Sequence, residues 1–238
     1  DSYIVIFLGA TIFQRTFIYF AKNNDIKVSE ELQPWHLNNV KIGFCREVQN
    51  PKHIWLFSHG NAAQASERDY MLKHIEPSDS IYLIEYPGFG KRPGSPTQTS
   101  LNEAVTEAYQ ALRQQFPNIP VGAIGESLGS GPTSHLATLA NPPDKIVLLV
   151  PYDAIVNVAK YRLPILPVNL LIKDRWDNIA ALQNYKAPLE IYGAENDSVI
   201  PCRLAQNLAK NLPQATFHLM PGGHLTWSKK SDPMIRFP

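Results

Sequence analysis

The sequence has few cysteines, almost no net charge, and no internal repeat or low-complexity tract. Among its 238 residues, the two cysteines Cys45 and Cys202 stand far apart and outside any CxxC pair. This excludes a disulfide scaffold and a zinc ribbon, and we expect each cysteine to be a small core residue rather than a reactive thiol. Lys and Arg number 22 against 21 Asp and Glu, for a formal net charge of +1. The sequence therefore gives no electrostatic reason to expect nucleic acid as a partner.

Long hydrophobic runs are also scarce. Residues 3–13 (YIVIFLGATIF) form an eleven-residue run, whereas a helix that crosses a bilayer takes about 20 residues. Two interpretations stay open for the apolar N-terminal segment 1–20. It is either the remainder of a membrane anchor, which would give membrane association, or a strand or helix that packs onto the domain. The compartment stays open between the cytoplasm and a membrane surface.

The composition, with 44% hydrophobic and 18% charged residues, predicts one folded domain over residues 1–238. Short β-branched and aromatic runs alternate with helical patterns along the chain. The expected strands are Val40–Val48, Ile54–Ser58, Ser80–Tyr86, Val121–Ile124, Lys145–Val150, Pro188–Tyr192 and Thr216–Met220. The expected helices are Ala62–Ile75, Ser100–Phe116, Ser127–Ala140 and Cys202–Leu212. Nearly continuous apolar strands that alternate with helices predict a doubly wound α/β fold with a mostly parallel sheet.

Two local signals refine this expectation, and one segment interrupts it. Ser100 and Glu103 form an S-x-x-E capping box for the second helix, and Pro201 fits the first turn of the last one. Residues 152–185 hold no strand pattern and follow a strand end, where an insertion lies over the ligand crevice. We expect a small helical cap there; the alternative is an ordinary crossover with one helix.

The strongest chemical signal is the G-x-S-x-G sequence of residues 125–129, between a predicted strand and a predicted helix. In this arrangement the serine occupies a tight, strained turn that exposes its hydroxyl, so Ser127 is the candidate nucleophile. The helix N-terminus at that place favours developing negative charge. The alternative is a glycine-rich turn in which Ser127 only caps the helix.

A serine nucleophile needs a base and an acid that orients the base. His224 stands in a Gly-Gly-His loop after the last predicted strand, and Asp197 follows the strand before it. The chain order Ser127, Asp197, His224 is that of the α/β-hydrolases. Asp153, after the preceding strand, and Glu195, on the same loop as Asp197, are the competing acids.

The oxyanion of such a reaction needs backbone donors. The N–H of Leu128 is one expected donor, and the N–H of Asn61, in the loop Ser-His-Gly-Asn-Ala after the strand IWLF, is the other, with Ala62 as the alternative. His59 is expected to hold this loop rather than to transfer protons. The sequence holds no H-E-x-x-H and no clustered His/Cys set, so we expect no metal and no cofactor.

The motifs SHGNA, EYPGFGKRPGSP, GESLGSG, GAENDSVIP and GGH together resemble the α/β-hydrolase-fold serine hydrolases over nearly the whole chain. The likeness is greatest to the Bem46-like branch and to the α/β-hydrolase domain-containing proteins 13 and 17. That branch implies an N-terminal membrane anchor, a segment like Thr16–Phe20 (TFIYF), and a short cap. Its DYRGYGxSxGxP loop differs here, since Pro87 replaces Arg and Lys91-Arg92 replace a small residue.

The residues and the resemblance together predict a serine hydrolase that cleaves carboxylic ester or thioester bonds through an acyl-enzyme on Ser127. The expected substrate is a small-molecule or lipid-like acyl compound, or an acylated protein. Apolar cap residues suggest a hydrophobic acyl group, unless they only bury the cap helix: Leu163, Ile165, Leu166, Val168, Leu170 and Leu171. Two alternatives are a serine aminopeptidase or oligopeptidase, and a catalytically silent member that binds a membrane or a partner.

Overall fold

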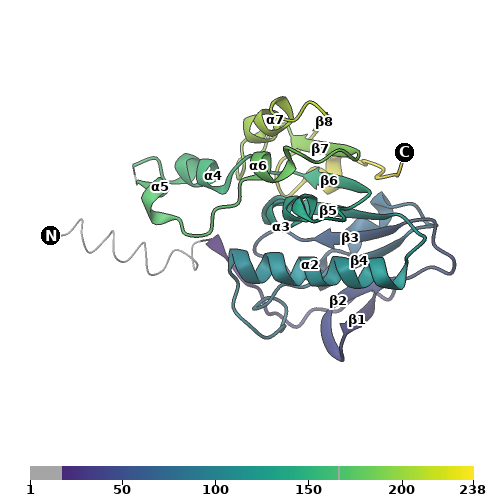
Figure 1. Ribbon diagram of the computed structural model, residues 1–238. Coiled ribbons are helices and arrows are strands. Elements are labelled where there is room, and N and C mark those ends of the chain that lie inside the picture. The colour runs from purple at the N-terminus through teal and green to yellow at the C-terminus, as the bar shows by residue number, and fades with distance from the viewer. Residues whose placement is uncertain (1–17, 166) are drawn as a thin grey trace.

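Eight strands form one twisted, mostly parallel sheet in the computed structural model, which describes residues 18–165 and 167–238 (Figure 1). The strand order is β1-β2-β4-β3-β5-β6-β7-β8. The first two pairings, β1 with β2 and β2 with β4, are antiparallel, and the other five are parallel. The chain therefore reverses its winding at β3, and the loops that follow the parallel strands meet at one edge of the sheet.

The elements have the following bounds. The strands are β1 (Gln33–Leu37), β2 (Val40–Arg46), β3 (Ile54–Ser58), β4 (Ser80–Ile84), β5 (Val121–Glu126), β6 (Lys145–Leu149), β7 (Leu189–Ala194) and β8 (Ala215–Met220). The α-helices are α2 (Gln98–Gln115), α3 (Ser130–His135), α4 (Ile155–Arg162), α5 (Val168–Leu171), α6 (Asn178–Leu182), α7 (Cys202–Lys210) and α8 (Trp227–Lys230). Short 3₁₀ helices cover Ala65–Glu67, Asp69–His74, Ser127–Gly129 and Leu136–Thr138.

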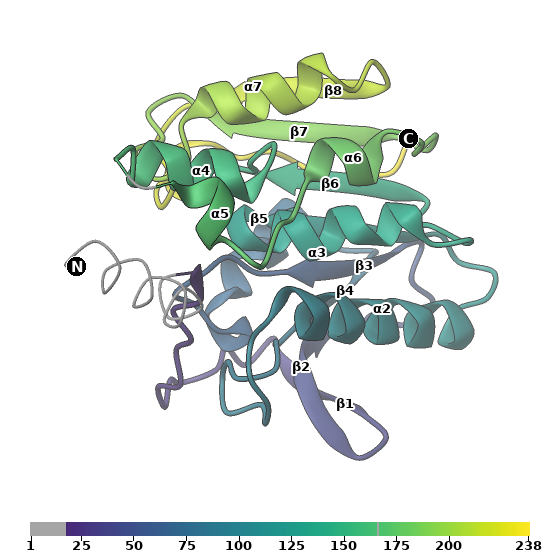
Figure 2. The ribbon, with the colours of Figure 1, turned by 60° about the vertical axis from the view of Figure 1, so that its left-hand side comes forward.

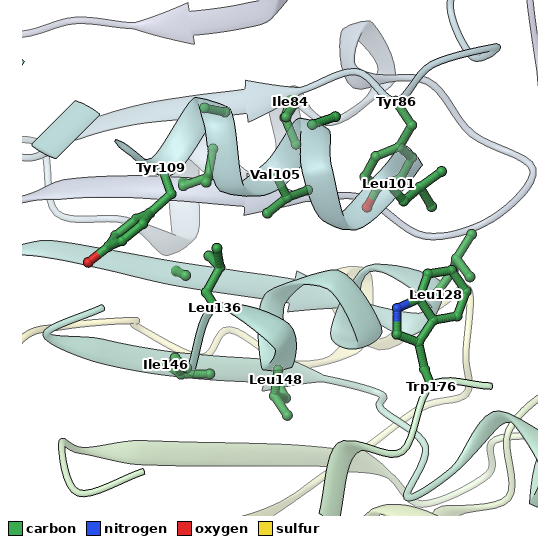
Figure 3. Close-up of a cluster of buried hydrophobic side chains, with 14 of the residues drawn as sticks. Ile84, Tyr86, Leu101, Val105, Tyr109, Leu128, Leu136, Ile146, Leu148 and Trp176 are labelled. Carbon is green, nitrogen blue, oxygen red and sulfur yellow. The ribbon is translucent and has the colours of Figure 1, made fainter. Parts of the chain in front are cut away.

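The sheet is covered on both faces, which explains why β3 to β6 are apolar along their length. On one face α2, α3, α6 and α7 pack over the strands, with Val105 and Tyr109 of α2 on the side of Leu136, just after α3, and Leu101 beside Tyr86 (Figure 3). On the other face the 3₁₀ helix Asp69–His74, α8 and the last residues of the chain form a second apolar layer. Burial on both faces fixes the sheet and so fixes the edge where the loops meet.

The sequence predicted seven of the eight strands. It missed β1, which pairs with β2 through a hairpin whose turn residues, Asn38 and Asn39, have φ of 49° and 64°. Asparagine tolerates this left-handed conformation, as the turn requires. Pro34 argued against a strand in the sequence, because a proline removes one hydrogen-bond donor from the strand pairing. The structure accommodates Pro34 because β1 lies at the edge of the sheet.

Two helix expectations were wrong. Residues 62–75 form two short 3₁₀ helices rather than one α-helix. The N-cap of α2 is Thr97, not Ser100: the Thr97 hydroxyl accepts the Ser100 N–H at 2.9 Å, and the Ser100 hydroxyl accepts the Thr97 N–H at 2.9 Å. The reciprocal pair forms one turn earlier than the S-x-x-E pattern indicated, because serine at the third helical position serves here in place of glutamate.

The segment 152–185 carries α4, α5 and α6, and its described residues contribute no strand to the sheet. Figure 2 shows α4 and α5 beyond the ends toward which the parallel strands point. Among the residues that the structure describes, no helix is long and apolar enough to span a bilayer. The apolar run 3–13 lies outside the described residues, so the two interpretations of the N-terminal segment stay predictions.

Candidate active site

Three side chains that are distant in sequence meet at the edge where the parallel strands end. His224 Nε2 lies 2.8 Å from Ser127 Oγ, and His224 Nδ1 lies 2.7 Å from Asp197 Oδ2. Ser127 directly follows β5, Asp197 lies in the loop after β7, and His224 lies in the loop after β8. An ionised carboxylate only accepts hydrogen bonds, so the proton of the neutral ring sits on Nδ1 and Nε2 accepts from the hydroxyl. All three residues are largely buried, with exposed fractions of 8–9%.

The backbone at Ser127 is strained, as the G-x-S-x-G turn requires. Its φ is 52°, in the left-handed region that a serine rarely adopts. A Cβ on Gly129 would lie 2.0 Å from Ser58 O, and a Cβ on Gly125 would lie 2.6 Å from Gly129 O. The two glycines therefore let helix and strand approach closely while the turn presents the Ser127 hydroxyl to His224.

The structure separates Asp197 from its two competitors. Asp197 Oδ1 accepts the N–H groups of Val199 and Ile200 at 2.9 and 2.7 Å, which leaves Oδ2 for His224. Asp153 is buried but occupied elsewhere, since it accepts the N–H of Ala154 and the Asn207 side chain at 2.6 and 2.7 Å. Glu195 is exposed, and it is Asp197 that contacts the imidazole.

The loop after β3 passes directly beside the serine. A Cβ on Gly60 would lie 3.2 Å from Ser127 Cβ, so the glycine allows this close approach. His59 is fully buried, with Nδ1 at 2.7 Å from Gly60 O and Nε2 at 2.9 Å from Glu85 Oε1, and its carbonyl accepts the Tyr86 hydroxyl at 2.7 Å. Since both ring nitrogens face loop acceptors, His59 holds the loop and neither nitrogen is placed to serve Ser127.

The side chain of Asn61 fastens the same loop to the start of the described chain. Its Oδ1 accepts the N–H of Phe20 at 2.8 Å, and its Nδ2 donates to Ile18 O at 2.6 Å. Ala62, the alternative oxyanion donor, is exposed and has φ of 53°. The Asn61 backbone is thus held between two fixed points: Gly60 against Ser127, and its own side chain against residues 18–20.

Residues 18–25 continue as a strap over the neighbouring loops. Gly90 N donates to Lys22 O at 2.9 Å, the Gln64 side chain donates to Asn24 O at 2.9 Å, and the Lys22 ammonium pairs with Glu67 at 2.7 Å. Buried Tyr19 donates its hydroxyl to Asp174 of the segment 152–185 at 2.8 Å. The strap therefore joins the loop after β3, the loop after β4 and the segment after β6.

Glu85 and two of the sequence departures in the loop after β4, Lys91 and Arg92, have structural roles. Glu85 receives His59 on one oxygen and the Ala65 N–H on the other, at 2.9 Å each. The Arg92 guanidinium donates to Glu85 O at 2.6 Å, and Lys91 pairs with Asp25 of the strap. Glu85 thus ties the loop after β4 to the segment after β3, and Lys91 ties it to the strap.

The sequence did not predict the polar group beneath the nucleophile. Glu126 accepts the Tyr70 hydroxyl at 2.6 Å and the Trp227 indole N–H at 3.2 Å, and its second oxygen lies 3.9 Å from Arg68. Burial, and then the Glu126 charge, hold the pKa of Tyr70 well above its usual range, so Tyr70 stays a donor. The position of Glu126, directly before the serine of G-x-S-x-G, was the only available signal, and nothing local marked Tyr70.

The site offers no ligand set for a metal. Within the described ranges, no group of three or more His, Cys, Asp or Glu side chains could hold an ion. Both cysteines are free; burial raises the pKa of the Cys45 thiol to about 12, and burial together with Asp197 raises that of Cys202. Neither thiol is activated as a nucleophile.

Comparisons with known proteins bear on the fold of the chain. No protein-family model matches the chain. It is 26% identical to the lysophosphatidylserine lipase ABHD12 of Danio rerio, over 73% of this chain and 53% of that one. It is 32% identical to the human α/β-hydrolase domain-containing protein 17B, over 42% of this chain and 36% of the relative. A solved Pyrococcus furiosus esterase matches at a TM-score of 0.61 and 15% identity, covering 87% and 91% of the two chains.

The motifs predicted an α/β-hydrolase fold. The sheet, with its antiparallel first strands and parallel remainder, and the named relatives support the same fold. The chain has the α/β-hydrolase fold, and its sequence is similar to those of α/β-hydrolase domain-containing proteins.

Proposed function

We propose that the protein is a serine hydrolase that cleaves carboxylic ester or thioester bonds of apolar acyl substrates. The observation that carries the proposal is the continuous chain of hydrogen-bond contacts from Ser127 through His224 to Asp197. A relative named as a lipase and a structural neighbour named as an esterase support the same class of reaction.

In the proposed reaction His224 Nε2 takes the Ser127 proton as Oγ attacks the acyl carbonyl. The imidazolium that forms is stabilised by Asp197, which stays ionised. His224 then donates the proton to the departing alkoxide or thiolate and leaves an acyl-enzyme on Ser127. A water molecule, deprotonated by the same nitrogen, attacks the acyl group and restores the serine.

The oxyanion of each tetrahedral intermediate is proposed to bind the backbone N–H groups of Leu128 and Asn61. The contact of Gly60 with Ser127 supports this role for the loop after β3, since it brings that backbone beside the reacting atom. Leu128 follows the nucleophile at the N-terminus of a helical segment. One such donor is worth roughly 3 kcal/mol of transition-state stabilisation.

The proposed apolar preference rests on the segment 152–185, taken as a cap. Val168 and Leu171 of α5 are buried, whereas Leu163, Ile165 and Leu170 are exposed. Only the buried side of α5 is therefore offered as an apolar contact for an acyl chain. The substrate is proposed to be a lipid-like acyl compound or an acylated protein.

A fluorophosphonate probe tests the proposal. The wild-type protein should gain the phosphonyl mass on the peptide that contains Ser127, because the probe needs a hydroxyl activated by a base. The Ser127→Ala variant should remain unlabelled. Label that persists in this variant, or that never appears in the wild type, would refute a serine hydrolase centred here.

A substrate panel separates the remaining alternatives. The proposal predicts turnover of p-nitrophenyl esters and acyl thioesters and little turnover of amino-acid amides. Faster hydrolysis of the amides would favour an aminopeptidase or oligopeptidase. Absence of turnover on every member, in protein that the probe does not label, would favour a silent binding protein.

Replacing Asn61 by alanine should lower kcat while KM changes little. The substitution keeps the backbone donor and removes the side-chain bonds to Ile18 and Phe20, so the donor is less well positioned. A displacement near 1 Å costs about 100-fold in rate. Steady-state kinetics on one ester measure the change in kcat and KM. Asn207→Ala, on α7, is the matched control and should leave kcat unchanged. Unchanged kcat in Asn61→Ala would show that the side-chain bonds do not position the loop.

A further inference from the structure

Large apolar side chains are exposed around the segment 152–185. Ile165 is 94% exposed and Leu170 is 74% exposed, and Tyr161 and Leu163 are also exposed. We name these four side chains the cap tip. They lie on and between α4 and α5, which extend beyond the body of the sheet (Figures 1 and 2). Contiguous exposed apolar groups mark an interaction surface.

Packing of the segment itself does not account for these side chains. Val168 and Leu171 supply its buried side, while Leu170 projects from the same helix into solvent. No residue of α4 is buried. The segment therefore directs part of its apolar content away from the domain core.

The charge around the cap tip is of one sign. Residues 155–173 contain three basic residues, Lys160, Arg162 and Lys173, all exposed, and no Asp or Glu. The acids that flank this stretch, Asp153 and Asp174, are buried and hydrogen-bonded to Asn207 and to Tyr19. Arg203 of α7 adds a further cation, 5.4 Å from the Tyr161 ring. Next along the chain, Asp177 caps α6.

Two more exposed apolar residues belong to the same edge of the sheet. Phe20, 55% exposed, is bonded through its N–H to the loop after β3, and Leu225, 81% exposed, directly follows His224. Their positions relate the cap tip to the site, since all these segments adjoin the carboxyl ends of the parallel strands.

We propose that the cap tip is a docking surface for a lipid bilayer with anionic headgroups. Aliphatic side chains flanked by Lys and Arg are the composition of interfacial membrane-binding elements. A protein partner is less well matched, because leucine is under-represented among the residues that carry protein–protein binding energy. Docking in this orientation turns the carboxyl edge, with Ser127, toward the lipid.

A fluorescent label tests the docking directly in the full chain. With Cys202 replaced by alanine, the buried Cys45 is the only native thiol, and Ile165→Cys can carry an environment-sensitive nitrobenzoxadiazole group. Vesicles of phosphatidylcholine with about 30% phosphatidylserine should shift its emission to the blue and allow quenching by doxyl lipids, as expected for insertion at the headgroup boundary. The same label at Val40→Cys, on the exposed β1–β2 hairpin, should not respond.

The outcomes separate the occupants of this surface. A label at position 165 that stays in water while the protein sediments with vesicles would overturn the proposal and assign binding to another segment. Equal responses with pure phosphatidylcholine would overturn the role of the basic residues. Failure to bind either vesicle would leave a protein partner as the explanation of the exposed cap tip and would also overturn the proposal.

A second experiment links docking to turnover and rests on the proposed function. Ile165→Glu with Leu170→Glu should reduce hydrolysis of a long-chain ester held in anionic vesicles at least tenfold and leave a soluble short-chain ester unaffected. Val40→Glu is the matched control. Equal losses on both esters would overturn the proposal. A wild type inactive on the soluble ester would refute the proposed function, and the labelling result would still stand.

Discussion

Replacing Ser127 by alanine is expected to lower kcat by about a million-fold, because the covalent pathway is lost and only binding and oxyanion stabilisation remain. The expected loss is about as large as for His224 and larger than for Asp197. Single-turnover measurements with an activated ester detect it, and the far-UV circular dichroism should be unchanged because Ser127 lies in a turn that its neighbours fix. A residual rate within tenfold of the wild type would move the nucleophile elsewhere.

The same position offers a matched pair of variants that separates chemistry from strain. Ser127→Gly should be as inactive as Ser127→Ala but more stable by about 1 kcal/mol, since glycine adopts a φ of 52° without penalty. Urea unfolding of the two variants measures the difference. If the alanine variant were the more stable one, the turn would not be strained, and the G-x-S-x-G geometry would need another explanation.

The parts of this site that the sequence predicted are those whose signal is local or positional. Five consecutive residues determine the turn at Ser127, and its two glycines, Gly125 and Gly129, allow the close backbone approaches seen in the structure. Asp197 and His224 could be proposed because each follows a strand of the predicted parallel sheet. Parallel strands end at one edge, so residues that follow different strands meet there although they are far apart in sequence.

The residues that support the site were not predictable in the same way. Asn61 binds the backbone of Ile18 and Phe20, so its side-chain role depends on where a segment about 40 residues away passes. Glu126 and Tyr70 are likewise brought together only by the fold. No periodicity or spacing encodes such pairs, because each depends on the path of two independent segments.

The wrong helix prediction for residues 62–75 has the same cause, because contacts with distant segments decide the local structure. The 62–75 region has helical composition, yet Ala65 N–H donates to Glu85 and Gln64 to Asn24, so tertiary bonds to the strap and to the loop after β4 accompany two 3₁₀ turns there. Local propensity is a weak prior that such contacts override. The strap also means that the N-terminal segment and the loop beside Ser127 share one hydrogen-bond network.

Replacing Asp197 by asparagine is expected to reduce kcat by about ten-thousand-fold, and the structure gives the reason. Asp197 Oδ1 is fixed by two backbone N–H groups, from Val199 and Ile200, so the asparagine carbonyl must take that place. Its NH₂ then faces His224 Nδ1 and donates to it, which forces the ring proton onto Nε2. A protonated Nε2 cannot accept the Ser127 proton, so the base is lost while the fold is kept.

Asp153→Asn is the matched control, because Asp153 is also a buried carboxylate that follows a strand. Its oxygens accept from Ala154 and Asn207, so an NH₂ group would face a donor and cost about 1–3 kcal/mol of stability. Turnover per folded molecule should nevertheless be retained, since Asp153 binds Ala154 and Asn207 while Asp197 is the partner of His224. Thermal unfolding and active-site titration separate the two effects. If Asp153→Asn lost kcat and Asp197→Asn kept it, the acid would belong to the loop after β6, and the hydrogen bond between His224 and Asp197 would have no part in catalysis.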